Sequence, residues 1–244
     1  MRVKKIHWNA FSTCNLRCQF CYLWRPTERS ILSTSLAKTL LEKSSGVTDS
    51  FVFGGGDPLL RKDILELVVY AKQINLRVDL QTNAVALTEN LARNLFPRLD
   101  RLGLSMDGED EKTHDELRGN PGNFNAILGF LEIAEKIGTK VTIRTIVTKK
   151  NLGKIKGILS LLKAFTCIEK WNVREFTPLG RGFIFKSFFE ISRNEFKKEV
   201  TQIKDFAASS EISFPIVPIT ADDMKEGSSL FQVGNPKFNR PAMR

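Results

Sequence analysis

The chain has 244 residues, of which 42% are hydrophobic, so it can bury one sizeable core as a single α/β domain or two small ones. No run of about 18 apolar residues occurs, and the N-terminus leads directly into a strand-like stretch, so we expect a soluble cytoplasmic protein without a membrane span or signal peptide. The formal net charge of +10 could attract anionic partners, but the basic residues lie among apolar helix positions. Solvated helix faces are the simpler explanation of this charge, and a nucleic-acid partner is not expected.

A loop rich in cysteine follows the first predicted strand, which covers residues 3–12. Cys14, Cys18 and Cys21 are three of the chain's four cysteines and fall within eight residues. This spacing is too short for sensible disulfides but suits three thiolates on one metal centre. Three thiolates can hold a [4Fe–4S] cube and leave one iron open, whereas a closed zinc site would need a fourth ligand such as His7.

Strands and helices alternate through the next part of the chain. After a helix that begins near Ser33, we predict a strand at 50–53, a helix at 60–74, a strand at 77–82, a helix at 88–96, a strand at 99–106, a helix at 123–137, a strand at 140–147, a helix at 153–164 and a strand at 171–176. Six strands followed by helices imply parallel pairing with right-handed crossovers and functional residues at the C-terminal strand ends. Beyond residue 183 the pattern changes to a helix near 192–208, a strand-like stretch at 212–217 and a tail rich in Gly, Pro and Asn.

Polar and glycine-rich segments follow three of the predicted strands. The second strand is followed by Gly54-Gly55-Gly56-Asp57-Pro58, the third by Gln81-Thr82-Asn83 and the fourth by Ser105-Met106-Asp107-Gly108. The glycines would let the backbone approach a ligand, and Asp57 could cap a helix that begins with proline. Each segment could also be an ordinary turn.

The Cys-x-x-x-Cys-x-x-Cys spacing, with Phe20 immediately before the third cysteine, resembles the signature of the radical S-adenosylmethionine (radical SAM) enzymes. The resemblance covers residues 6–180 and implies a partial TIM barrel, with a (β/α)6 core over residues 1–182. Residues 183–244 would then form a short α/β extension that covers the mouth of the barrel. The implied cofactors are S-adenosylmethionine (SAM) and one [4Fe–4S] cluster held by Cys14, Cys18 and Cys21.

The segments at the strand ends resemble the SAM-binding motifs of the same family. Gly55-Gly56-Asp57 resembles the Gly-Gly-Glu-Pro segment that binds the methionine amino group, although Asp57 is one methylene shorter than Glu. Thr82-Asn83 resembles a Thr-Asn-Gly segment, with Ala84 where glycine is common. Related enzymes hold the SAM carboxylate with a serine and an arginine, which Ser105 and Arg118 match here. The full set of cofactor contacts that the resemblance implies is Phe20, Tyr22, Gly55, Gly56, Asp57, Asn83, Ser105, Arg118, Ile146 and Val147.

The resemblance also implies a reaction. The reduced cluster would donate one electron to SAM, giving methionine and a 5′-deoxyadenosyl radical that abstracts hydrogen from a substrate. No side chain beyond the cofactor ligands needs to be catalytic, because the cofactors carry the difficult chemistry. The expected partners are a small-molecule or peptide substrate and an electron donor such as flavodoxin or ferredoxin.

Two substrate classes stay open at this point. Arg144, Arg174 and Arg181 near the strand ends would suit a small or anionic substrate, although they could instead pair with nearby carboxylates. The alternative is a peptide or cofactor maturase of the branch that carries auxiliary clusters. Only Cys167 remains outside the loop, which disfavours an auxiliary cluster and a disulfide framework. A non-catalytic iron–sulfur or zinc module is the alternative outside enzymes.

Overall fold

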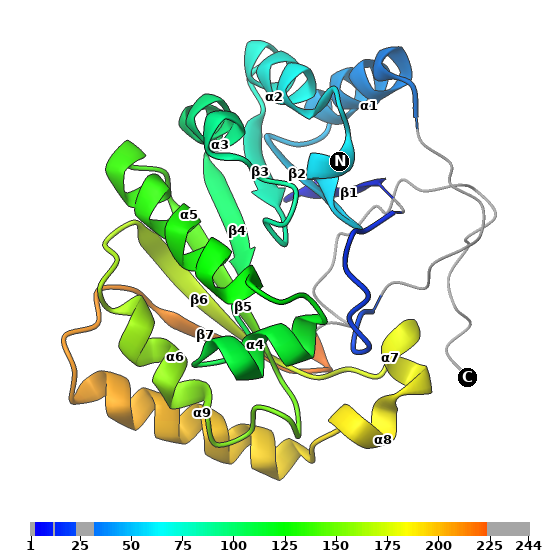
Figure 1. Cartoon of the computed structure of the whole chain (residues 1–244). Helices are drawn as coiled ribbons and strands as arrows, with labels where there is room; N and C mark the ends of the chain where they lie inside the picture. Colours follow the sequence, from blue (N-terminus) through cyan, green and yellow to red (C-terminus); the bar gives the residue numbers. More distant parts are fainter. Residues whose placement is uncertain (1–2, 12, 23–31, 224–244) are drawn as a thin grey trace.

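The computed structural model describes residues 3–11, 13–22 and 32–223, which contain a seven-stranded parallel sheet (Figure 1). The strands lie side by side in the order in which they occur along the chain. They are β1 (Ile6–Phe11), β2 (Ser50–Gly55), β3 (Arg77–Gln81), β4 (Arg101–Ser105), β5 (Val141–Val147), β6 (Ile168–Glu175) and β7 (Ile216–Ile219). The predicted parallel α/β class is therefore confirmed.

Helices follow the strands and cover one side of the sheet in an arc (Figure 1). They are α1 (Thr34–Ser45), α2 (Ile64–Gln73), α3 (Glu89–Leu95), α4 (Glu111–Arg118), α5 (Asn123–Ile137), α6 (Ile155–Leu162), α7 (Arg181–Ile184), α8 (Lys186–Phe189) and α9 (Arg193–Ala208), with the short 3₁₀ turns η1 (Pro58–Leu60) and η2 (Phe96–Arg98). Several begin at a side-chain cap: the hydroxyls of Ser33, Thr88 and Ser192 each accept a backbone hydrogen bond from the first turn. None of the helices in the described part of the chain is long and apolar enough to cross a bilayer.

Successive side chains along each strand enter different environments. Phe53, Leu104 and Ile143 are fully buried in the main hydrophobic core between the sheet and the helices. Arg101 and Arg144 alternate with such residues and are only partly buried. Because side chains of a strand point alternately to its two faces, the sheet has an apolar face toward the helices and a polar face away from them.

Helix α4 is an element that apolar periodicity does not indicate, since Leu117 is its only apolar residue. It begins at Asp110, whose carboxylate accepts a hydrogen bond from the Thr113 backbone N–H at 2.7 Å. It ends at Gly119, which has a φ of 63° and provides the left-handed C-cap. Local capping therefore fixes both ends of a helix whose last residue, Arg118, belongs to the candidate site.

The C-terminal part adds a strand to the expected six. Strand β7 pairs in parallel with β6, with Trp171 opposite Ile216. Helix α9 packs on α6, and its Phe196 and Ile203 enter the main core. The sequence indicated both elements but not that the strand joins the same sheet. The division at residue 182 stays a prediction, and so does the cover over the barrel mouth, because residues 224–244 lie outside the described residues.

Candidate functional site

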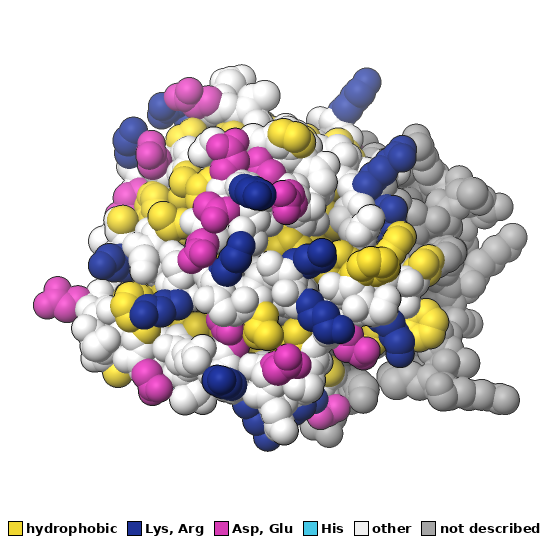
Figure 2. All heavy atoms as spheres, turned by 60° about the horizontal axis from the view of Figure 1, so that its bottom comes forward, with side chains coloured by type: hydrophobic (Ala, Val, Ile, Leu, Met, Phe, Trp, Pro, Cys, Tyr) yellow, Lys and Arg dark blue, Asp and Glu magenta, His cyan; other side chains and the backbone are white. Residues whose placement is uncertain are grey.

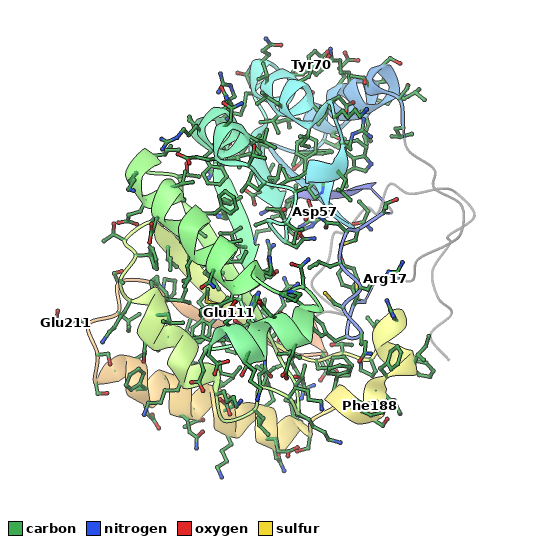
Figure 3. All side chains as sticks on the ribbon, viewed as in Figure 1. Arg17, Asp57, Tyr70, Glu111, Phe188 and Glu211 are labelled. Atoms are coloured by element: carbon green, nitrogen blue, oxygen red, sulfur yellow. The ribbon has the colours of Figure 1, made fainter. Side chains whose placement is uncertain are left out.

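The cysteine loop leaves the C-terminal end of β1 and lies beside the glycine-rich segment that follows β2 (Figure 3). Cys14, Cys18 and Cys21 do not form disulfides. The Cys21 backbone N–H donates to the Cys18 carbonyl at 3.3 Å, which closes a turn between these two cysteines. The Asp57 backbone N–H donates to the Thr13 carbonyl at 3.1 Å, so the loop and the segment after β2 are tied together.

An apolar cluster holds the cysteine loop in place. Leu16 and Phe20 of the loop are buried against Leu117 of α4, together with Phe176 and Phe189. The rings of Phe20 and Phe189 meet edge to face, with centroids 5.9 Å apart. The side chains between the cysteines thus anchor the loop, and Cys18 is itself buried in this cluster with Cys14 and Cys21 packed against it.

The chemistry of the three thiols fits an iron–sulfur cube. Burial raises the pKa of Cys18 to about 11, and the positive charge of Arg118 opposes this shift. Within the described ranges, no three His, Cys, Asp or Glu side chains are grouped closely enough to hold a single metal ion. A cube binds its cysteines through separate iron atoms, so it does not require three thiols to meet at one point. Cys14, Cys18 and Cys21 are therefore the residues that would hold a cluster.

Asp57 joins the ends of β2 and β3. Its carboxylate accepts hydrogen bonds from the Leu59 backbone at 2.9 Å, the Thr82 hydroxyl at 2.8 Å and the Asn83 backbone at 2.7 Å. Burial raises the pKa of Asp57, and these hydrogen bonds oppose the shift. The Asn83 side-chain amide in turn donates to the Cys14 sulfur at 3.4 Å. Asp57 therefore positions Asn83 next to the cysteine loop, which the sequence motifs did not reveal.

Arg118 lies between a carboxylate, an aromatic ring and the cysteine loop. Its guanidinium forms a buried ion pair with Asp107 and lies 5.4 Å from the centre of the Phe20 ring. The carbonyl oxygen of Arg118 accepts a hydrogen bond from the Cys18 thiol at 3.5 Å. The Nε atom of Arg118 is buried and makes no hydrogen bond in the described part of the chain. This free donor is suited to a ligand carboxylate.

A buried hydrogen-bond chain behind the site was not foreseen from the sequence. The Asp107 backbone N–H donates to Nδ1 of His114 at 3.1 Å, which leaves the His114 Nε2–H to donate to Asn123 Oδ1 at 3.0 Å. The Asn123 amide then donates to the Asn83 carbonyl at 2.9 Å, and Asn83 contacts Cys14. Burial lowers the pKa of His114, so the neutral ring required by this chain is favoured. The sequence held one signal for this role of His114, which lies one helical turn before the predicted SAM contact Arg118.

The remaining predicted SAM contacts divide between the site and the core. Three of these residues are partly exposed at the C-terminal ends of β2 and β4, namely Gly55, Gly56 and Ser105. Gly55 has a φ of 109°. Ile146 packs against the apolar cluster that holds the cysteine loop. Val147 is fully buried in the main core on the helix side of the sheet. Neighbouring strand residues point to opposite faces, so the side chains of Ile146 and Val147 do not enter the same site.

Tyr22 and Cys167 lie in different surroundings. Tyr22 directly follows the third cysteine, and its side chain is 48% exposed. Cys167 precedes β6 at the opposite end of the strands from the cysteine loop and packs against the main core. Burial raises the pKa of Cys167 to about 12, and the carboxylate of Glu135 adds to the shift. Cys167 is therefore a packed thiol outside the site.

Comparison with known proteins gives relatives over most of the chain. The sequence pattern of the Radical SAM superfamily matches residues 8–162. An AdoMet-dependent heme synthase from Oleidesulfovibrio alaskensis is 33% identical over 181 residues, which cover 72% of this chain and 46% of that protein. Fe-coproporphyrin III synthase from Methanosarcina barkeri is 31% identical over 229 residues, which cover 92% of this chain and 57% of that protein.

The same fold occurs in a solved structure. Streptococcus suis SuiB bound to S-adenosylmethionine has a TM-score of 0.75 at 16% identity and covers 89% of this chain and 50% of its own. The chain spans about half the length of the first relatives it matches, 46% and 52% for two heme synthases. The family pattern matches more than half of the chain, residues 8–162. The chain therefore belongs to the radical SAM superfamily.

Proposed function

We propose that this chain is a radical SAM enzyme that abstracts hydrogen from a small anionic substrate. The observation that carries the proposal is the loop with three cysteines outside any disulfide, which lies against Asn83 and Arg118 near the C-terminal ends of the strands. When bound, the cluster and SAM supply one-electron cleavage of SAM to methionine and a 5′-deoxyadenosyl radical. The described residues act by binding and orienting these groups.

Each group of residues has a proposed task. Cys14, Cys18 and Cys21 hold the cluster, and the Arg118 guanidinium binds the SAM carboxylate through its Nε donor, which has no partner among the described residues. Asp107 fixes the orientation of that guanidinium by its ion pair. Phe20, against which Arg118 stacks, excludes water from this side of the site, which strengthens charged interactions there.

The names of the relatives support a small substrate. Relatives above 30% identity are a heme synthase and an Fe-coproporphyrin III synthase. Porphyrins of this kind carry carboxylate side chains, which agrees with the expected anion. A peptide substrate is the second candidate, because one structural neighbour is SuiB bound to the precursor peptide SuiA and a 29%-identical relative is the mycofactocin maturase MftC. The peptide-bearing neighbour supports the peptide candidate through its fold alone.

An electron donor such as flavodoxin or ferredoxin is the proposed protein partner. A pocket of about 420 Å³ lies on the outer side of the cysteine loop and is lined by Arg17, Lys112, Lys150 and Lys154, together with two carboxylates. This basic surface suits an acidic redox protein that must approach the cluster. Elsewhere on the face shown in Figure 2, basic and acidic side chains are interspersed, as expected for solvated helix faces. Reduction by an acidic donor should slow as salt is added, because salt screens exposed charges.

SAM cleavage by the reduced protein tests the proposed function. The chain is reconstituted with iron and sulfide without oxygen, reduced with dithionite and supplied with SAM, and 5′-deoxyadenosine and methionine are quantified. We expect both products from the wild type and none from Cys18→Ala. A wild type that binds iron but releases neither product would instead support the non-catalytic module.

Arg118 provides a separate test of the SAM site. We expect Arg118→Ala to weaken SAM binding to the reconstituted protein by about 1.5–3 kcal/mol, the scale of a hydrogen bond to a charged group. Arg118→Lys should recover part of this loss, since lysine keeps the charge but not the planar fork. Unchanged SAM affinity in both variants would assign the carboxylate to another residue.

A further inference from the structure

The polar face of the sheet has a paired layer of charges at its N-terminal end. Asp79 accepts hydrogen bonds from Lys5 at 2.8 Å and from Arg101 at 3.5 Å. Arg101 also forms an ion pair with Glu169. Lys5 and Arg101 are therefore each paired with a carboxylate, and Lys170 lies beside the same four groups as a further cation.

Arg144 and Arg174 lie on the same face, nearer the C-terminal ends of their strands, and are not balanced. Neither guanidinium group makes an ion pair or a hydrogen bond in the described part of the chain, and the Nε atom of each is buried without a partner. The charges that act on Arg144 include Arg174, which repels it, and Asp79, which is already paired. Burial lowers the pKa of Arg174, and the influence that opposes this shift comes from Tyr22 rather than from a carboxylate. Burial and Arg174 lower the pKa of Arg144 to about 9.

The neighbouring residues make room for these guanidinium groups and leave them positively charged. A Cβ atom at Gly103 would lie 2.5 Å from Nη1 of Arg144, so glycine is needed for the observed position of that side chain. His7 faces the same region, and burial together with Arg144 lowers its pKa to about 4, so it adds no charge at neutral pH. Ile146 lies two residues after Arg144 on the same face of β5 and packs in the apolar cluster of the cysteine loop, so Arg144 lies close to that loop.

We propose that Arg144 and Arg174 together bind an oxyanion of the substrate, a carboxylate or a phosphate, on the polar face beside the cysteine loop. Burying an unpaired positive charge destabilises the folded state, and an anionic ligand would provide the negative charge that these two arginines lack. The planar guanidinium fork matches the geometry of both oxyanions. This inference rests on the proposed function, because it assigns the charged end of the substrate of the same site.

Ligand-dependent stability of the reconstituted protein tests this subsite. Thermal unfolding is measured in sodium acetate, sodium phosphate and sodium chloride of equal ionic strength, for the wild type and for Arg144→Gln, Arg174→Gln and Gly103→Ala. The wild-type midpoint should rise by a few degrees in acetate, phosphate or both relative to chloride, because a ligand that binds only the folded state stabilises it. The anion that raises the midpoint identifies the carboxylate or the phosphate as the group bound. The rise should be lost in all three variants.

Two controls separate the subsite from general effects. Arg93→Gln removes one positive charge from an exposed pair with Glu89 on α3 and should keep the full anion effect. Gly103→Ala keeps every charge but displaces the guanidinium of Arg144. Loss of the anion-induced stabilisation in this variant would therefore result from the position of the guanidinium and not from a change in charge. No stabilisation of the wild type by either anion, or an equal loss in Arg93→Gln, would overturn the proposal.

Stability in chloride alone gives an independent readout. If the unpaired charge of Arg144 serves to bind a ligand, that charge destabilises the folded state while the ligand is absent. Arg144→Gln should then raise the unfolding midpoint in sodium chloride. A lower midpoint would mean that Arg144 is a structural residue and would contradict the proposal. Neither measurement requires SAM cleavage, so a failure here is distinct from a failure of the proposed function.

Discussion

At the scale of single residues, the four cysteines separate into two classes with different expected behaviour. Cys14, Cys18 and Cys21 lie on one loop at the C-terminal end of β1, whereas Cys167 packs against the core at the other end of the sheet. We expect each Cys→Ala change in the loop to abolish cluster loading, because a cube needs all three thiolates. Anaerobic reconstitution followed by iron counting should give about four irons per wild-type chain.

Cys167→Ala is the matched control for this prediction and should load the cluster like the wild type. About eight irons per wild-type chain would reveal a second cluster. Iron loading that survives in a loop variant would contradict the assignment of that cysteine.

His7 should make the stability of the fold depend on pH. Burial and the positive charges of Arg144 and Lys5 lower its pKa from 6.5 to about 4. As pH falls below 6.5, the unfolded chain binds a proton at His7 that the folded chain does not bind, so folding becomes less favourable. Above this pH both states are neutral at His7 and the contribution is constant.

His7→Gln isolates this contribution, because all other titrating groups are shared with the wild type. The free energy of unfolding should be measured for both between pH 8 and about pH 5. The difference between the two free energies of unfolding should be constant near pH 8. Toward pH 5 the wild type should lose stability relative to His7→Gln. A parallel pair of pH profiles would show that His7 is not buried beside these charges.

Candidate residues could be identified from the sequence where a short spacing sets them apart. The cysteine spacing identified the candidate ligands without knowledge of the fold. Asp57 was different, because its carboxylate serves three donors on two strand ends, and such a network depends on which strands are neighbours. Ala84 has a φ of 66°, a left-handed conformation that agrees with the glycine common at this position of the Thr-Asn-Gly segment.

At the scale of elements, Gly108 controls the start of the segment that carries Arg118. A Cβ atom there would lie 2.3 Å from the backbone nitrogen of His114 in α4, and backbone cannot move aside as a side chain can. We expect Gly108→Ala to destabilise the fold by about 1–3 kcal/mol, the usual cost of overpacking. Because α4 ends at Arg118, SAM affinity should fall as well.

Denaturant unfolding and SAM titration measure these two effects. Gly129→Ala is the matched control, since a Cβ atom at this position of α5 meets nothing within 4 Å and alanine favours helices. It should leave SAM binding unchanged and stability equal or higher. A Gly108→Ala protein with wild-type stability would show that α4 can shift without cost.

Elements with strong periodicity were predictable, and those defined by capping were not. The predicted helix over 123–137 coincides with α5 (Asn123–Ile137), in which apolar residues recur at helical spacing. The short polar helix α4 lacks such a pattern and depends on Asp110 and Gly119 at its ends. The predicted helix at 60–74 begins later in the structure, because Asp57 first caps the 3₁₀ turn η1.

At the scale of the whole molecule, the sheet continues past the expected sixth strand. Trp171 of β6 donates its backbone N–H to the Pro215 carbonyl at 3.0 Å, and β7 pairs along the same edge. The sequence pattern predicted a strand in this region. Which strand it pairs with depends on contacts between residues that are far apart along the chain. Arg144 and Arg174 were expected near the strand ends, but the pairing of Asp79 with Lys5 and Arg101 was not foreseen, since these charges come from different strands.

Residues 183–219 should therefore unfold together with the rest of the sheet. Phe196, Val200, Ile203 and Phe214 are buried in the main core, and α9 covers α6. Burying four such side chains contributes roughly 6–12 kcal/mol at about 1.5–3 kcal/mol each, which is comparable to the whole stability of an ordinary domain. A chain that ends at residue 182 would expose the face of α6 that α9 covers, and we expect it not to fold.

Unfolding of the intact chain followed by two probes can test this coupling. Far-ultraviolet circular dichroism reports all helices, and a fluorophore attached to a cysteine placed at the exposed residue Lys197 on α9 reports the C-terminal part. The four native cysteines, Cys14, Cys18, Cys21 and Cys167, are changed to Ala so that only position 197 is labelled. Coincident denaturant curves would show one cooperative unit. Phe196→Ala should lower the midpoint of both curves equally, by about 3–5 kcal/mol in free energy of unfolding, because it leaves a cavity in the shared core. If the fluorophore reported an earlier transition while circular dichroism kept a later one, residues 183–219 would be a separate unit, as the division at residue 182 supposes.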